Sequence, residues 1–239
     1  MRFKSYRLSS IMKKALRIIS IIFLGLILIL FIGYLILNES KPVGTPSPEA
    51  DELARKVELA LNKAAWDSTK TVSWTFRGEN NYEWDKETHV VNVTWGGNEV
   101  ILEPGSQSGV VINRENYTAE ESTALIKVAW DNFNNDSFWL CAPYKLFDPE
   151  TERSLVASKD GRKGLMITYT SGGTTPGDSY VWIVDENYMP VAIKMWVKIL
   201  PIGGMEFSWE NYKTLSSGAM VAQDHWLFGR LNVDISNLK

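Results

Sequence analysis

The residue types that most often carry out catalysis are scarce in this sequence. It contains two histidines, His89 and His225, and a single cysteine, Cys141. The adjacent pair Asp136 and Ser137 would need a histidine base to form a hydrolytic triad, and His225 lies far away in the sequence. Cys141 sits within the apolar stretch FWLCAP, which favours a buried small side chain over a reactive thiol. None of these spacings predicts a nucleophile paired with a base.

Motifs for acyl, phosphate or metal chemistry are also incomplete. GSQSG at 105–109 has Gln107 where a hydrolase elbow has serine, and SGGTTPGD at 171–178 lacks the lysine and the following helix of a P-loop. The two histidines do not have metal-ligand spacing, and no cysteine pair assists them. We therefore expect no enzyme activity, no catalytic residues, no metal site and no cofactor. The least favoured alternative is an enzyme with an unrecognised site, in which four acids would have to converge: Asp185, Glu186, Glu206 and Glu210.

Aromatic residues on predicted strands are the strongest remaining signal. Several of these strands are apolar on both faces, so we expect the aromatic side chains to line a ligand cavity. The predicted lining residues are Trp74, Phe76, Tyr82, Trp84, Trp95, Trp182, Trp196, Phe207 and Trp209. Lys194 and Lys198 share a strand face with Trp196 and would meet a lipid headgroup or a carboxylate at the cavity rim. The alternatives are a packed core for the aromatic residues and a solvated edge for the lysines.

Residues 180–199, YVWIVDENYMPVAIKMWVKI, predict a β-hairpin that is apolar on both faces. Antiparallel sheets often turn one face to water, which gives a regular alternation of apolar and polar residues. Here the face that carries Trp182 is apolar, and the opposite face is apolar as well. In the first strand Val181 and Ile183 lie opposite Trp182. In the return strand one face carries Val191, Ile193, Met195, Val197 and Ile199, and the other carries Ala192, Lys194, Trp196 and Lys198. Another part of the chain, or a ligand, must cover the second apolar face.

The remaining patterns predict an α+β domain. One amphipathic helix is expected at about 48–66, with Ser47 as its N-cap, and a second at 118–135, with Thr118 and Glu121 as a capping box. Alternating apolar residues predict roughly nine or ten antiparallel strands. The predicted fold is an N-terminal transmembrane helix followed by a large curved antiparallel sheet, a half-barrel, with two covering helices. A cavity is expected where the helices leave the concave side open.

The N-terminus predicts a membrane anchor. Residues 18–37 contain no charge and would span about 30 Å as a helix. This stretch is longer than the apolar core of a secretory signal and has no A-x-A cleavage site, although cleavage remains the alternative. Residues 1–17 form a basic tail with six positive charges, which the positive-inside rule places in the cytoplasm. Met12 is a second plausible start of the chain.

We therefore expect a single-pass protein of the cytoplasmic (inner) membrane. Residues 38–47 would be a linker, and residues 48–239 would form a periplasmic or otherwise extracytoplasmic domain. Beyond residue 17 the chain holds 19 of the 25 basic residues and all 28 acidic residues, a net charge of −9. Nucleic-acid-binding domains usually carry a concentrated basic surface, so nucleic acid is not an expected partner.

The order of the elements resembles the LolA/LolB superfamily of lipoprotein carriers. The likeness covers residues 48–235 and includes a leading helix, TVSWTFRG at 71–78 and the hairpin at 180–196. NNDSFWLCAPYKLFDP and SGGTTPGDSYVW also resemble stretches of membrane-anchored bacterial envelope proteins with this fold. The resemblance implies a half-barrel, lidded by helices, that binds acyl chains. The carriers are soluble after signal cleavage and their receptors are held by a lipidated N-terminal cysteine, whereas we expect this chain to keep its apolar helix, and no cysteine lies near its N-terminus. No functional residue of the family can be matched to a position of this sequence.

These observations predict a non-catalytic, membrane-anchored envelope protein. It would bind a lipid, or the acyl chain of a lipoprotein partner, in an aromatic-lined half-barrel cavity. The alternative is a protein-interaction or sensor module whose core is filled by its own side chains and whose rim contacts another envelope protein.

Overall fold

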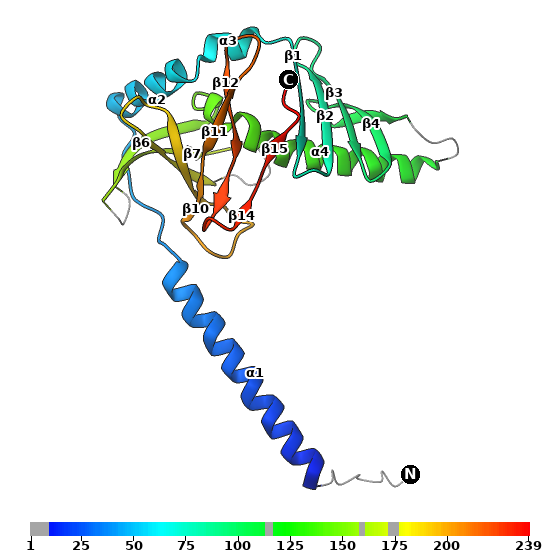
Figure 1. The fold of residues 1–239 in the computed structure, drawn as a ribbon, viewed down its shortest axis with the longest axis vertical. Coiled ribbons are helices and arrows are strands. Elements are labelled where there is room, and N and C mark those ends of the chain that lie inside the picture. The colour runs from blue at the N-terminus through cyan, green and yellow to red at the C-terminus, as the bar shows by residue number, and fades with distance from the viewer. Residues whose placement is uncertain (1–9, 113–116, 158–160, 172–176) are drawn as a thin grey trace.

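The computed structural model describes residues 10–112, 117–157, 161–171 and 177–239 (Figure 1). The glycine-rich stretch at 171–178 lies largely outside these ranges, as do residues 1–9 of the basic tail.

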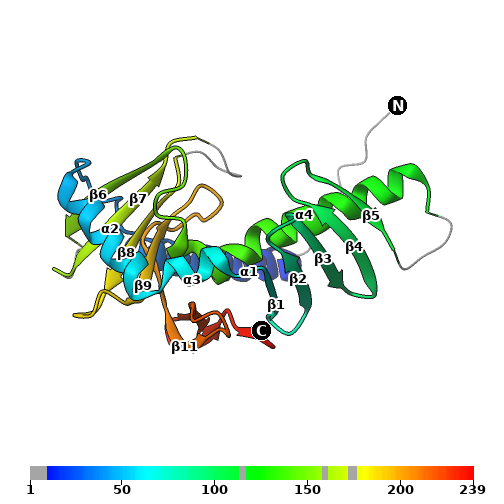
Figure 2. The ribbon, with the colours of Figure 1, turned by 90° about the horizontal axis from the view of Figure 1, so that it is seen from above.

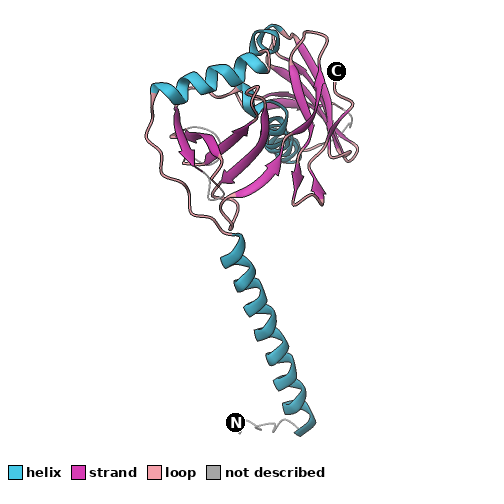
Figure 3. Ribbon diagram, turned by 60° about the vertical axis from the view of Figure 1, so that its left-hand side comes forward, coloured by secondary structure: helices cyan, strands magenta, loops and turns pink. Residues whose placement is uncertain are grey.

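The first helix, α1 (Ser10–Leu37), projects from the rest of the molecule (Figures 1 and 3). Its apolar side chains from Leu16 onward are exposed, since no other part of the described chain packs on them. Lys14–Leu37 has a mean hydropathy of 3.0 over the most apolar window, so α1 is long and apolar enough to cross a membrane. The expected N-terminal apolar helix is confirmed, and its length and composition suit either an anchor or a signal sequence.

Two short helices follow, α2 (Pro48–Ala60) and α3 (Lys63–Ser68). Ser47 caps α2 as expected, since its side chain accepts a hydrogen bond from the amide of Ala50. The single helix predicted at 48–66 is interrupted at Asn62, whose φ of 58° is left-handed. The Leu61 carbonyl accepts hydrogen bonds from the Tyr144 hydroxyl and the Met220 amide, so distant contacts end α2.

The first large sheet has the strand order β15-β1-β2-β3-β4-β5 and is antiparallel at every pairing. Its strands are β1 (Thr71–Phe76), β2 (Asn80–Asp85), β3 (Val90–Trp95), β4 (Asn98–Glu103), β5 (Ser108–Val111) and β15 (Ile235–Ser236). Helix α4 (Ala119–Cys141) packs on one face of this sheet (Figure 2). Its capping box of Thr118 and Glu121 is present as predicted.

The second large sheet has the order β14-β13-β10-β9-β8-β7-β6. Its strands are β6 (Thr151–Ala157), β7 (Lys163–Tyr169), β8 (Ser179–Val184), β9 (Pro190–Trp196), β10 (Met205–Ser208), β13 (Trp226–Leu227) and β14 (Leu231–Asn232). Helix α2 packs against β6 and β7 and contacts the short 3-10 helix η1 (Ala142–Tyr144). Strands β11 (Glu210–Thr214) and β12 (Met220–Asp224) form a separate ribbon.

The α+β class, with large antiparallel strand pairing and covering helices, is confirmed, although one large curved sheet was expected. The strands divide into two large sheets and a ribbon, and the sheets do not close into a barrel. The C-terminal part of α4 contacts β12, so this helix extends from the first sheet to the centre of the molecule (Figure 2).

The second apolar face of the hairpin at 180–199 is covered by residues 38–46. This face of the second sheet carries a separate buried cluster of Val156, Met166, Val181, Ile183 and Ala192, with Trp196 beside it. The Trp196 indole N–H donates to the carbonyl of Glu39 at 2.9 Å. Further along, Pro46 forms a bridge with Ser154, and a Cβ on Gly44 would lie 2.8 Å from Val156. The segment between α1 and α2 is therefore docked against the sheet over its length.

Candidate binding surfaces

Six of the nine predicted cavity residues lie in the packed core. Trp74, Tyr82, Trp182 and Trp209 are at most 2% exposed, and Phe76 and Phe207 are 6% exposed. Trp84 and Trp95 pack half-buried against the same core, whereas Trp196 lies on the opposite face of the second sheet. The structure therefore does not bring the nine side chains together around one space.

The core aromatic residues form two groups joined by α4. In the first sheet Trp74 stacks on Tyr82 with ring centroids 4.5 Å apart, and Phe133 of α4 packs edge-on against Trp84 at 5.4 Å. In the second group Trp139 of α4 contacts Phe207 at 4.9 Å and Trp209 at 5.9 Å. The sequence did not single out Phe133 and Trp139 for this role. Phe133 lies on the covering helix predicted at 118–135, and Trp139 lies beyond its predicted end, because α4 continues to Cys141.

The two lysines predicted at the rim have different environments. Lys198 is exposed, and its backbone amide donates to the Asp178 carboxylate. The Lys194 side chain is only 4% exposed, and its ammonium lies 3.1 Å from Glu39 and 3.7 Å from Glu206. Glu206 also pairs with Arg162 at 2.5 Å. Lys194 is thus part of the contact between the segment 38–46 and the sheet.

Asp136 forms a buried polar site between α4 and the first sheet. Its carboxylate accepts hydrogen bonds from the Tyr82 hydroxyl at 2.5 Å, from the Asn80 amide at 2.8 Å and from the Asn135 amide at 2.9 Å. Burial raises the pKa of Asp136 above its ordinary value, and the three donors oppose that rise. The same burial raises the pKa of Tyr82. These bonds join the helix to the sheet.

His225 is buried among aromatic rings and makes no bond to Asp136 or Ser137 in the described structure. Its Nδ1 lies 2.7 Å from the Val233 carbonyl, and its Nε2 is buried without a hydrogen-bond partner. Burial lowers its pKa to about 4, so the ring is neutral at physiological pH. Trp209 lies 4.0 Å from this ring, centroid to centroid.

Cys141 is buried, and burial raises the pKa of its thiol, as expected of an inert side chain. Among the described residues no group of three His, Cys, Asp or Glu side chains has metal-binding geometry.

A groove of about 620 Å³ lies on the first sheet, centred on β1–β4. The register places Ser73, Glu83, Asn92, Ile101 and Val110 side by side across β1–β5. These side chains alternate with the buried aromatic positions, so they belong to the face opposite α4. We call this outward face of β1–β5 the sheet groove. It is open to a partner because none of the described helices covers it (Figure 2).

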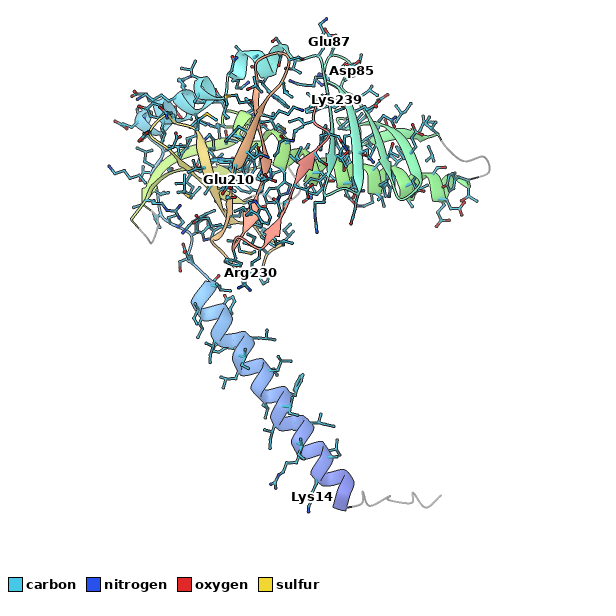
Figure 4. All side chains as sticks on the ribbon, in the orientation of Figure 1. Lys14, Asp85, Glu87, Glu210, Arg230 and Lys239 are labelled. Carbon is cyan, nitrogen blue, oxygen red and sulfur yellow. The ribbon has the colours of Figure 1, made fainter. Side chains whose placement is uncertain are left out.

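The sheet groove is acidic and partly apolar. Strands β1–β5 contain no Lys or Arg, and their acids are Glu83, Asp85, Glu99 and Glu103. Ile101 is 40% exposed and Val110 is 61% exposed. Lys239 marks one edge, since its backbone pairs with that of Ser73, and it lies near Asp85 and Glu87 at one end of the sheet (Figure 4). The alternation of polar with aromatic residues could have revealed this face in the sequence.

A second pocket of about 410 Å³ lies where α1 ends. It is lined by residues 38–42 together with Ala157 and Trp196. Trp196 is the only one of the nine predicted cavity residues that lines it.

No protein-family model matches the sequence, and no curated protein matches it either. Among solved structures, the chain is similar to the crystal structure of a DUF1329 family protein from Desulfovibrio piger ATCC 29098. The two share 11% identity at a TM-score of 0.34, over 78% of this chain and 92% of the other. So weak a likeness assigns neither a fold family nor a function, and the resemblance to the LolA/LolB superfamily stays a prediction.

Proposed function

We propose that this chain is a membrane-anchored, non-catalytic binding protein that receives a protein partner in the sheet groove. Helix α1 would span the cytoplasmic membrane with the basic tail in the cytoplasm, which places the folded domain outside. Two observations support a retained anchor. The apolar surface of α1 is exposed in the part of the chain that the structure describes, and contacts with the folded domain begin at Asn38, directly after the helix.

The observation that carries the proposal is the sheet groove itself. Its four acids and its exposed Ile101 and Val110 suit a partner segment that carries Lys or Arg beside aliphatic side chains. The aromatic residues, by contrast, pack mostly against one another in the core. The outward face of the first sheet is therefore the surface that a partner could bind. This favours the interaction module over a cavity within the core.

Photocrosslinking in intact cells tests the proposal. A photoreactive residue at position 101 is compared with one at Leu155, which is similarly exposed at 43% but lies on β6 of the second sheet. We expect one discrete protein adduct at 101 that Leu155 does not form. The substitutions Glu83→Lys and Asp85→Lys should abolish it. Equal adducts at both positions, no adduct, or an adduct that survives charge reversal would each refute the proposal.

A lipid or an acylated partner is the second candidate, and the pocket at the end of α1 favours it. Lys41, Pro42 and Trp196 line this pocket beside the point where the chain would leave the bilayer. Native mass spectrometry of the full chain in mild detergent, followed by lipid extraction, tests the idea. A stoichiometric lipid that Trp196→Ala removes would support it. A lipid-free mass with no uptake of added lipid would eliminate it.

A further inference from the structure

The β9–β10 loop, residues 197–204, is fixed beside the end of α1. The amide of Gly203 donates to the side-chain oxygen of Asn38 at 2.9 Å, and the amide of Glu39 donates to the Gly203 carbonyl at 2.9 Å. Lys194 and Trp196 hold Glu39 from the adjoining strand. If α1 ends at the surface of a bilayer, this loop must lie at that surface too.

A second loop reaches the same end of the second sheet. Strand β10 starts at Met205, next to the β9–β10 loop, and pairs antiparallel with β13 through Phe207 and Leu227. The chain therefore runs back toward the start of β10 as it enters the β13–β14 turn at residues 228–230. In the view of Figure 4, Arg230 lies on the side of the domain from which α1 extends.

Both loops expose apolar side chains next to cationic ones. Ile199 is 71% exposed and Phe228 is 63% exposed, and an exposed cation accompanies each, Lys198 in the first loop and Arg230 in the second. Ile199 was expected on the apolar face of the hairpin, but β9 ends at Trp196, so Ile199 projects from the loop instead. Apolar tips flanked by cations are typical of surfaces that enter the bilayer interface, where cations meet lipid phosphates.

We propose that Ile199 and Phe228 insert into the headgroup region of the bilayer that α1 spans, with Lys198 and Arg230 at the phosphate level. The occupant of this surface is the chain's own membrane, because Gly203 binds Asn38 and Glu39 directly after α1, and the β10–β13 pairing brings the second loop to the same end of the sheet. This inference rests on the anchor in the proposed function and adds an orientation. The domain rests on the membrane through two tips, which fixes the height and direction of the sheet groove.

The test uses the full-length protein in phosphatidylethanolamine–phosphatidylglycerol vesicles with or without nitroxide-labelled lipid. An environment-sensitive fluorophore is attached to cysteines placed one at a time at Ile199, Phe228, Leu59 and Leu30. Cys141 is 1% exposed and stays unlabelled in the folded protein. Leu59 is the matched control, because it is 78% exposed on α2, away from the end of α1 (Figure 1). Leu30 reports whether α1 is in the bilayer.

We expect a blue-shifted emission and nitroxide quenching at 199 and 228, stronger quenching at 30 and none at 59. In protein labelled at 228, Ile199→Asp together with Arg230→Glu should reduce the quenching. If position 30 is quenched while 199 and 228 behave like 59, the docking proposal is overturned and the anchor stands. If position 30 is not quenched, the anchor itself fails.

Discussion

His225 makes the stability of the domain depend on pH. Its pKa is about 4 in the folded protein, against an ordinary value of 6.5, because burial disfavours the charged ring. As the pH falls from 6.5 to 4, the unfolded chain binds a proton that the folded chain does not bind. Stability is therefore lost over this window, by about 3 kcal/mol in full.

We expect His225→Phe to remove this part of the pH dependence. The raised pKa of Asp136 acts in the opposite direction, since its contribution to stability falls as the pH rises above 3.8. For this reason the difference between variant and wild type is the informative quantity, measured by urea unfolding from pH 4 to 7. His89→Asn is the control, because His89 is exposed and asparagine tolerates its φ of 57°. Parallel pH curves for wild type and His225→Phe would contradict the prediction.

Glu39 and Lys194 should respond unequally to mutation although they form one ion pair. Glu39→Gln removes the carboxylate charge that lies 3.1 Å from the buried Lys194 ammonium, so we expect a loss of about 1–3 kcal/mol in the free energy of unfolding. Lys194→Met should cost less, because the carboxylates of Glu39 and Glu206 are partly exposed and can be hydrated. Urea midpoints measure both changes. Glu52→Gln, in an exposed pair with Lys56, should have no measurable effect. A greater loss of stability from Lys194→Met than from Glu39→Gln would contradict this prediction.

At the scale of elements, the packing of residues 38–46 against the second sheet requires a glycine at position 44. A Cβ on Gly44 would lie 2.6 Å from that of Ser154, closer than packed atoms allow. Gly44→Ala should lift residues 38–46 from the second sheet, with a cost of about 1–3 kcal/mol typical of overpacking. Hydrogen exchange is the measurement, and faster exchange at residues 38–46 is the expected result. Gly105→Ala, where a Cβ meets nothing within 4 Å, should leave that exchange unchanged.

Element starts were predictable from the sequence because their causes are local. The caps at Ser47 and Thr118 lie within three residues of the amides they bind. Helix ends were not predictable in the same way. Asn62 separates α2 from α3 at the point where Tyr144 and Met220 bind the Leu61 carbonyl. These two residues are distant in the sequence, so no local pattern predicts the contacts. Helix α4 runs to Cys141 and not to 135, because Trp139 and neighbouring side chains are buried by other elements.

At the scale of the whole molecule, the features that the sequence could not predict are those that depend on long-range contacts. Alternation along the strands identified the second apolar face of the hairpin, but the segment that covers it is held through Glu39, 155 residues before Lys194. The sequence also showed which strand positions carry aromatic residues. Whether they enclose a space depends on how Phe133 and Trp139 of α4 fill it, and spacing carries no information about that volume.

The docked segment should hold α1 and the domain in one arrangement. Spin labels at Leu24 in α1 and Leu59 in α2, both exposed, report the distance between the two parts by pulsed electron resonance. We expect a single narrow distribution in wild type. A broad one is expected in Glu39→Gln with Trp196→Phe, which lacks the indole donor and the glutamate charge. Labels at Leu59 and Ile101, both in the domain, should give the same narrow distribution in both proteins. A broad wild-type distribution between Leu24 and Leu59 would mean that residues 38–46 act as a free tether, and the sheet groove would then have no fixed height above the membrane.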